Sequence, residues 1–290
     1  MHSAVLVKLK NLDDLDNVMA PYDENQEKEA YVVETKQEAI DRIRAEANDK
    51  LKTYADYYKD PEAYKAANPS NFQLIQMLEE RKFDEVIKMT DEEIYSKVVQ
   101  AIYDESEFDN DGNIISTYNP DSHWDWWTVG GRWSGWLKSK KRDDGDGYIS
   151  NTEDGSCDFC KFSDIDIPAM MAVSPREIAR AEAMWEAAVN GAPIPKEFEE
   201  DHWFLYKKEY YLNRYGTKEK YLEHLHSICF SAVVDEKGWH TAGYSNLSYD
   251  DPDYMKDSNR IEREWEDRFF EDYFLNGDPD EYYVVVDCHI

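Results

Sequence analysis

The sequence contains no long apolar run. No stretch approaches the roughly 18 consecutive apolar residues of a membrane-spanning helix, so we expect no membrane partner. The first residues, "MHSAVLVKLKNLDD", lack the charged region, the long apolar region and the small-residue cleavage site of a signal peptide. These absences together predict a cytoplasmic protein.

Basic residues are also scarce. Lysine and arginine number 33 against 63 aspartates and glutamates, which gives a formal net charge of −30. Such a chain repels nucleic acid and attracts basic surfaces, so we expect no direct nucleic-acid partner. The excess can serve solubility alone, or it can mimic DNA phosphates for a basic protein. Two acidic blocks, Asp91 to Trp127 and Asp250 to Glu281, exceed what solubility requires, although solvated helix faces also produce such blocks.

Cysteine is limited to four residues. Cys157 and Cys160 have the spacing of half a zinc site, which a second close pair would have to complete. His224, His226 and Cys229 are candidates, but alternation along a strand would turn Cys229 away from both histidines. We therefore interpret the cysteines as unpaired thiols and expect no metal and no other cofactor.

The apolar residues that are present, 41% of the chain, are sufficient for a sizeable core. Three short runs rich in β-branched and aromatic residues predict strands at Ser3 to Leu9, Ser227 to Asp235 and Tyr282 to Ile290. Strands so far apart in the chain form a core only by pairing with one another. The sequence therefore predicts an α+β fold, with an antiparallel sheet that contains both chain termini and is interrupted by helical insertions.

Capping signals mark the starts of helices between these strands. Thr35 to Glu38 and Thr90 to Glu93 have the capping-box pattern, and Ser174 before Pro175 combines an N-cap with proline in the first turn. Apolar residues at helical spacing predict further helices at about residues 197–214 and 260–275.

These helices suggest a division of the chain. We predict an α+β core made of residues 1–34 and 106–290, and a helical insertion made of residues 35–105. Two turn clusters follow the insertion, "DNDGN" at residues 109–113 and "DDGDG" at residues 143–147. Both resemble calcium loops, but each lacks a ligand at an essential position, so we predict β-turns there.

The stretch "NPDSHWDWWTVGGRWSGWL", residues 119–137, contains five tryptophans and a double glycine. Strand alternation would place Trp124 and Trp126 on one face and Trp127 on the other. Gly130 and Gly131 would then permit a backbone conformation that is closed to other residues.

Two interpretations of this stretch remain open. In the first, Trp126 and Trp133 are buried in the core and Arg132 contacts a carboxylate, with Asp125 the nearest candidate. In the second, the stretch forms an aromatic slot that holds an anion, made of Asp125, Trp126, Trp127, Arg132 and Trp133.

A second group of chemically active residues lies at the ends of two predicted strands. His240 follows the strand at Ser227 to Asp235, and Asp287, Cys288 and His289 end the last strand. A histidine or cysteine beside a carboxylate is what acid–base or nucleophilic catalysis requires. Strand-terminal histidines are also common as structural residues, so both roles stay open.

Several motifs, in the same order, resemble a family of uncharacterised proteins encoded mainly by phages, prophages and their hosts. They are "APYDENQE", "DPEAY", "STYNPDSHWDWWTVGGRWSGWL", "SDIDI", "DEKGWH" and "VVVDCHI", and they span nearly the whole chain. The segment "TAGYSNLSYDD" departs from the family pattern, which has a Met-, Gly- and Trp-rich segment there. The resemblance implies a phage setting, in which small acidic proteins block host defence complexes. An inhibitor of the Gabija defence system is a candidate of about this size.

Charge and resemblance lead to two functional hypotheses. The first is a non-enzymatic anti-defence protein, as a monomer or homo-oligomer, that binds a host defence complex with a basic nucleic-acid-binding surface. Its acidic face is expected to be exposed on the last helix, opposite Trp265, and to consist of Glu262, Glu266, Asp267 and Glu271. The second is a small-molecule-binding protein or enzyme with a tryptophan-lined pocket that contains Arg132, Asp125, His240 and His289.

Overall fold

The chain forms two compact units in the computed structural model, which describes residues 2–141, 154–243 and 254–289. Unit 1 comprises residues 1–25 and 121–290, and unit 2 comprises residues 26–120. The predicted turn at residues 143–147 lies outside the described residues.

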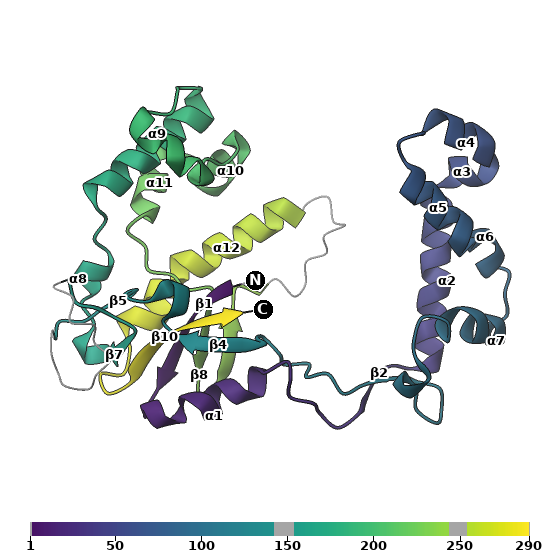
Figure 1. Cartoon of the computed structure of the whole chain (residues 1–290), viewed down its shortest axis with the longest axis horizontal. Helices are drawn as coiled ribbons and strands as arrows, with labels where there is room; N and C mark the ends of the chain where they lie inside the picture. The colour runs from purple at the N-terminus through teal and green to yellow at the C-terminus, as the bar shows by residue number, and fades with distance from the viewer. Residues whose placement is uncertain (1, 142–153, 244–253, 290) are drawn as a thin grey trace. The chain divides into compact units, whose positions relative to one another are not determined.

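Unit 1 is built on a six-stranded sheet that contains strands from both ends of the chain (Figure 1). The strand order is β4 (Trp126–Val129), β10 (Tyr282–His289), β1 (His2–Leu9), β8 (Ala232–Asp235) and β9 (Gly238–Thr241), and β7 (Phe159–Lys161) also pairs with β10. The predicted α+β class is confirmed. β10 is antiparallel to β1 and β4, but β8 is parallel to β1. The sheet is therefore mixed and not antiparallel, because a long helical connection returns the chain to the end where β1 begins.

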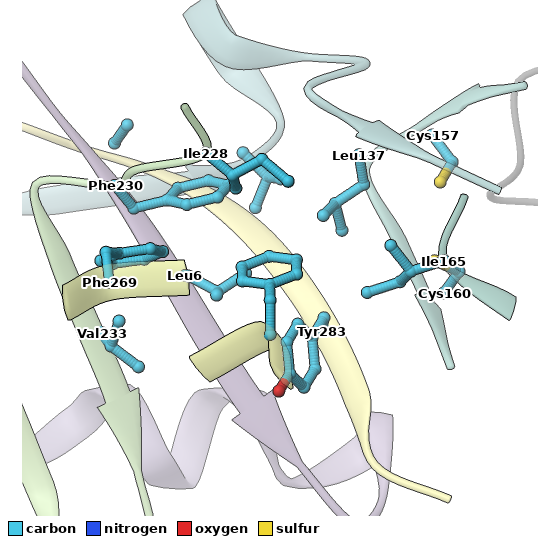
Figure 2. Packing of buried hydrophobic residues seen from close by; sticks show 13 residues of the cluster. Leu6, Leu137, Cys157, Cys160, Ile165, Ile228, Phe230, Val233, Phe269 and Tyr283 are labelled. Atoms are coloured by element: carbon cyan, nitrogen blue, oxygen red, sulfur yellow. The ribbon is translucent and has the colours of Figure 1, made fainter. Parts of the chain in front are cut away.

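Alternation along the strands gives the sheet two apolar faces. On one face, Leu6 and Val233 pack with Phe230 and with Phe269 of α12 (Tyr254–Phe270), as Figure 2 shows. On the other face, a second buried cluster contains the strand residues Val5, Val7, Val234 and Val284, together with Met19 of α1 (Leu15–Met19) and Trp124. Full burial of each such side chain is worth about 1.5–3 kcal/mol, so these two layers fix the strand register.

Most of the remaining elements of unit 1 lie between β4 and β8 along the chain. They are β5 (Leu137–Lys138), β6 (Ser156–Cys157), α8 (Ile167–Met170), α9 (Pro175–Asn190), a 3₁₀ segment (Lys196–Phe204), α10 (Lys208–Arg214) and α11 (Lys218–His224). The predicted N-cap at Ser174 is confirmed, and Glu177 completes a capping box there. The helix predicted at residues 197–214 is instead divided in two, since residues 205–207 are not helical.

Unit 2 is mainly helical and has its own buried core. Its elements are β2 (Tyr31–Glu34), α2 (Lys36–Thr53), α3 (Ala55–Lys59), α4 (Pro61–Ala67), α5 (Phe72–Arg81), α6 (Phe83–Val86), α7 (Asp91–Ile94), a π-helical turn (Tyr95–Val99) and β3 (Ile114–Ser116). The predicted capping boxes at Thr35 and Thr90 are both formed. Unit 2 extends beyond the predicted insertion because β2 and β3 pair with each other.

Two predicted elements of unit 1 have different bounds in the structure. The strand predicted from Ser227 begins only at Ala232. The last helix begins before residue 260, as α12, and continues as a π-helical turn over Glu271–Leu275. In the described ranges, no helix combines the length and apolarity that a membrane crossing requires.

Candidate functional site

The candidate site lies at the end of the sheet where β1 begins and β10 ends. Their antiparallel pairing places His2 directly opposite His289. Asp287 is two residues before His289 on β10 and therefore projects from the same face of the sheet. On the other side of β10, Trp126 of β4 is opposite His289. Residues from the two ends of the chain and from the tryptophan-rich stretch thus meet at one place.

Two histidine–carboxylate pairs form at this point, and we call them the paired dyads. Nδ1 of His2 lies 2.8 Å from Oδ1 of Asp287, and Nδ1 of His289 lies 2.7 Å from Oδ1 of Asp125. The centroids of the two imidazole rings are 4.9 Å apart, and the ring planes are inclined by 73°. The paired dyads therefore bring two proton-exchanging groups into direct contact.

The double glycine positions the backbone against Asp287. Gly130 and Gly131 have φ angles of +70° and +54°, as predicted for a conformation closed to other residues. A Cβ atom on Gly131 would lie 2.4 Å from Cβ of Asp287, so no side chain fits there. This close approach allows the backbone N–H of Arg132 to donate to Oδ2 of Asp287 at 3.0 Å.

Both carboxyl groups of the dyads are held in the ionised form. Burial favours a higher pKa for Asp287, but the Arg132 N–H and the hydrogen bond and charge of His2 outweigh it, so the pKa lies below its usual value. For Asp125, burial is likewise outweighed by the hydrogen bond and charge of His289, and this pKa is also lowered. An ionised carboxylate only accepts hydrogen bonds, so in each pair the proton is on Nδ1 of the histidine.

Tryptophan side chains surround the paired dyads. Trp126 is stacked on His289, with ring centroids 5.4 Å apart and planes inclined by 9°, and it meets His2 edge-on at 5.3 Å. The prediction that Trp126 is buried is wrong, since 45% of this residue is exposed. Trp133 is partly buried against the core, as is Trp127.

The predicted faces of the tryptophan stretch are also corrected. Trp124 belongs to the same core cluster as Trp127, whereas Trp126 projects to the opposite face. Strand β4 begins only at Trp126, so the residues before it do not follow strand alternation. Arg132 does contact a carboxylate, but through its backbone and with Asp287; Asp125, the predicted partner, pairs with His289.

Two residues of the predicted C-terminal group do not reach the paired dyads. His240 lies on β9 opposite Val233, and its Nε2 lies 2.8 Å from Oδ1 of Asp235. Cys288 projects into the opposite core face, where burial raises the pKa of its thiol to about 12. A thiol with such a pKa remains protonated at neutral pH and is a poor nucleophile.

The residues of the predicted zinc candidate do not form a metal site. Cys157 and Cys160 are buried in the core cluster near Leu137 and Ile165 (Figure 2), and His224 ends helix α11. Among the described residues, no three His, Cys, Asp or Glu side chains are grouped so that they could hold a metal ion.

The predicted acidic face on the last helix is only partly exposed. Glu262 and Glu266 both form ion pairs with the guanidinium of Arg214, which is itself largely buried. The prediction that these two glutamates are exposed is therefore wrong, because α10 packs against this side of α12. Asp267 and Glu271 are exposed, in accordance with the prediction.

No family model, no curated protein and no solved structure matches the chain. The function must therefore be inferred from the site itself. The sequence predicts site roles for Asp125, Trp126, Arg132, Asp287 and His289, but not for His2. A signal for His2 was present, because pairing of the first and last strands in antiparallel register places the second residue beside the next-to-last.

Proposed function

We propose that the paired dyads form a general acid–base site that cleaves an ester by hydrolysis. The observation that supports this function is the direct contact of two imidazole rings, each of which is oriented by its own carboxylate. A carboxylate on Nδ1 fixes the ring orientation and tautomer, and it stabilises the imidazolium that forms when the ring accepts a proton.

The proposed reaction uses both rings in opposite roles. A neutral imidazole accepts a proton from water at Nε2 while the water oxygen bonds to the ester centre. The neighbouring imidazolium donates a proton to the leaving oxygen as the ester bond breaks. The ring centroids are 4.9 Å apart, so both rings can reach one ester group. Proton exchange with solvent then restores both rings.

Two phosphodiesters test this reaction. Bis(p-nitrophenyl) phosphate has a leaving group that needs no proton, whereas the leaving group of diphenyl phosphate benefits from one. Removal of the general acid or the base typically costs about 10²–10⁴-fold in rate. We therefore expect His2→Ala and His289→Ala each to lower the diphenyl phosphate rate by this factor. Hydrolysis of bis(p-nitrophenyl) phosphate should be slowed as strongly only in the variant that lacks the general base, because its leaving group needs no general acid.

The matched control is His240→Ala, which removes a histidine–aspartate pair away from the dyads and should leave both rates unchanged. The wild-type rate should also have a bell-shaped pH dependence, since one ring must be neutral and the other protonated. If the two dyad variants hydrolyse both esters as fast as the wild type, the proposal is wrong.

Partner binding is a second candidate function, and a separate exposed surface favours it. The aromatic strip consists of Trp203, Phe204, Leu205 and Tyr206, at the end of the 3₁₀ segment and in the loop that leads to α10. All four residues are exposed, Trp203 by 76%. The strip is held in place, because Tyr211 donates its hydroxyl to the Phe204 carbonyl at 2.9 Å and the Arg180 guanidinium lies over the Phe204 ring. Large exposed aromatic residues are typical anchors of protein interfaces.

The proposed partner is a host defence complex with a basic nucleic-acid-binding surface, and the chain would act as a phage-encoded inhibitor. The net charge of −30 would increase the rate of association with a basic surface, and the aromatic strip would slow dissociation. We expect Trp203→Ser with Tyr206→Ser to abolish recovery of the partner from infected host cells. The control is Phe72→Ser, which removes an exposed aromatic residue of unit 2. Equal recovery by the strip variant and the wild type would exclude the strip as the interface.

A further inference from the structure

We infer that the paired dyads act on a dinucleotide, with the phosphodiester at the two imidazoles and one base on each of two exposed tryptophans. This inference rests on the proposed function, since it takes the paired dyads as the reacting centre. It adds the chemical class of the substrate, which the dyads alone do not define.

A continuous row of aromatic rings passes the dyads. Trp126 meets His2 at 5.3 Å, His2 meets Trp133 at 6.5 Å, and Trp133 meets Trp136 at 5.9 Å between ring centroids. The two ends of the row, Trp126 and Trp136, are each 45% exposed, whereas Trp133 between them is partly buried. A ligand with two flat rings joined by a reactive group fits this alternation of exposed ring, imidazole and exposed ring.

The end of the row at Trp136 is concave. Trp136 lines a cavity of about 360 Å³ together with Met170, Ile228, Phe230 and Lys138. Its lining is about equally polar and apolar, and Trp136 meets the Phe230 ring at 5.7 Å, which supports the exposed ring. Such a cavity is large enough for a nucleobase.

The middle of the row suits a phosphate. The Arg132 side chain is exposed, and its backbone is fixed beside the dyads by the bond from its N–H to Asp287. A guanidinium presents planar paired donors that match phosphate oxygens, and the imidazolium of a dyad adds a second positive charge. These groups favour an anionic ester over a neutral sugar, although sugars also stack on tryptophan.

The charge of the whole chain limits the length of the ligand. The protein has a net charge of −30, so its repulsion of a nucleic acid increases with each phosphate that the ligand contains. A single phosphodiester needs only the Arg132 guanidinium and the N–H donor of one dyad imidazolium. The substrate is therefore a dinucleotide and not a long nucleic acid.

Binding can be measured without turnover by isothermal titration with a hydrolysis-resistant methylene phosphonate analogue of ApA (called ApA below), with AMP and with inorganic phosphate. We expect the affinities to decrease in that order, because AMP offers one base and phosphate offers none. When an aromatic ring that stacks on a base is removed, the Kd is expected to rise by about 5- to 150-fold. Trp126→Ala and Trp136→Ala should each lower the affinity for ApA by this factor. Trp136→Phe keeps an aromatic ring and should retain most of the wild-type affinity.

Trp203→Ala is the control for removal of an exposed tryptophan elsewhere, and it should leave ApA binding unchanged. Equal affinities for ApA and AMP, or no effect of Trp136→Ala on ApA, would overturn the assignment to a dinucleotide. Ester hydrolysis by a protein that binds neither ApA nor AMP would also overturn it, while the acid–base proposal would stand. Binding of ApA that depends on Trp126 and Trp136, without hydrolysis of any ester, would support the ligand class and refute the reaction.

Discussion

At the scale of single residues, Asp287 combines structural and chemical roles. Its carboxylate is 2% exposed, accepts a hydrogen bond from the Arg132 backbone and holds His2. Hydrogen bonds to a charged group contribute about 1.5–3 kcal/mol. We therefore expect Asp287→Asn to lower the free energy of unfolding at pH 7 by about this amount, as measured by denaturant titration.

The pH dependence of this effect follows from the lowered pKa of Asp287. A carboxyl group whose pKa is lower in the folded state stabilises the protein above its unfolded pKa of about 3.9, and this stabilisation is lost as the pH falls through the folded value. The gap between the wild type and Asp287→Asn should thus be full at pH 7 and shrink below about pH 4. Asp125→Asn, at a more exposed carboxyl, should have a smaller effect at pH 7. A gap that stays constant or widens in acid would contradict this account of Asp287.

At the scale of secondary-structure elements, local signals in the sequence were sufficient wherever the cause is local. The capping boxes at Thr35, Thr90 and Ser174 all form, because each depends on hydrogen bonds within four residues. The strands at the two chain ends were also predictable, since their apolar runs are long and β-branched. The positive φ angles of Gly130 and Gly131 were predictable as well, because they depend only on the residue type at each position.

Predictions failed where distant parts of the chain decide the outcome. The parallel pairing of β8 with β1 depends on the path of the connection and not on the strand sequence. Exposure of Glu262 and Glu266 was predicted from helical spacing, but Arg214 of another helix pairs with both. Trp126 was assigned to the core because tryptophan is usually buried, whereas β4 is an edge strand that leaves this ring half-exposed.

The candidate site was predictable only in part, because its residue types are visible in the sequence but its long-range contacts are not. Asp125, Asp287 and His289 were identified by residue type, but their partners were not, because each bond joins residues that are far apart in sequence. His2 lies 285 positions from Asp287. Only the register of β1 against β10 shows that the two meet, and that register results from packing of both faces of the sheet.

At the scale of the whole molecule, the paired dyads and the core around them belong entirely to unit 1. The chain leaves and re-enters this unit at neighbouring points, because Glu24 donates its N–H to the Trp124 carbonyl at 2.9 Å and Asn25 donates to the Asp125 carbonyl at 3.1 Å. A short linker can therefore replace unit 2 at little cost, since the closure entropy of a loop changes slowly with its length.

We therefore expect a chain in which a short Gly–Ser linker replaces residues 26–120 to fold with its sheet intact. It should hydrolyse the phosphodiester probes within a few-fold of the full chain and lose the helical circular-dichroism signal of unit 2. Since the aromatic strip also lies in unit 1, partner recovery should be retained as well. The separate 26–120 fragment, which has its own buried cluster, should be helical by circular dichroism but inactive. A shortened chain that folds, as judged by a cooperative thermal transition, yet shows no ester hydrolysis would mean that unit 2 contributes to the reaction.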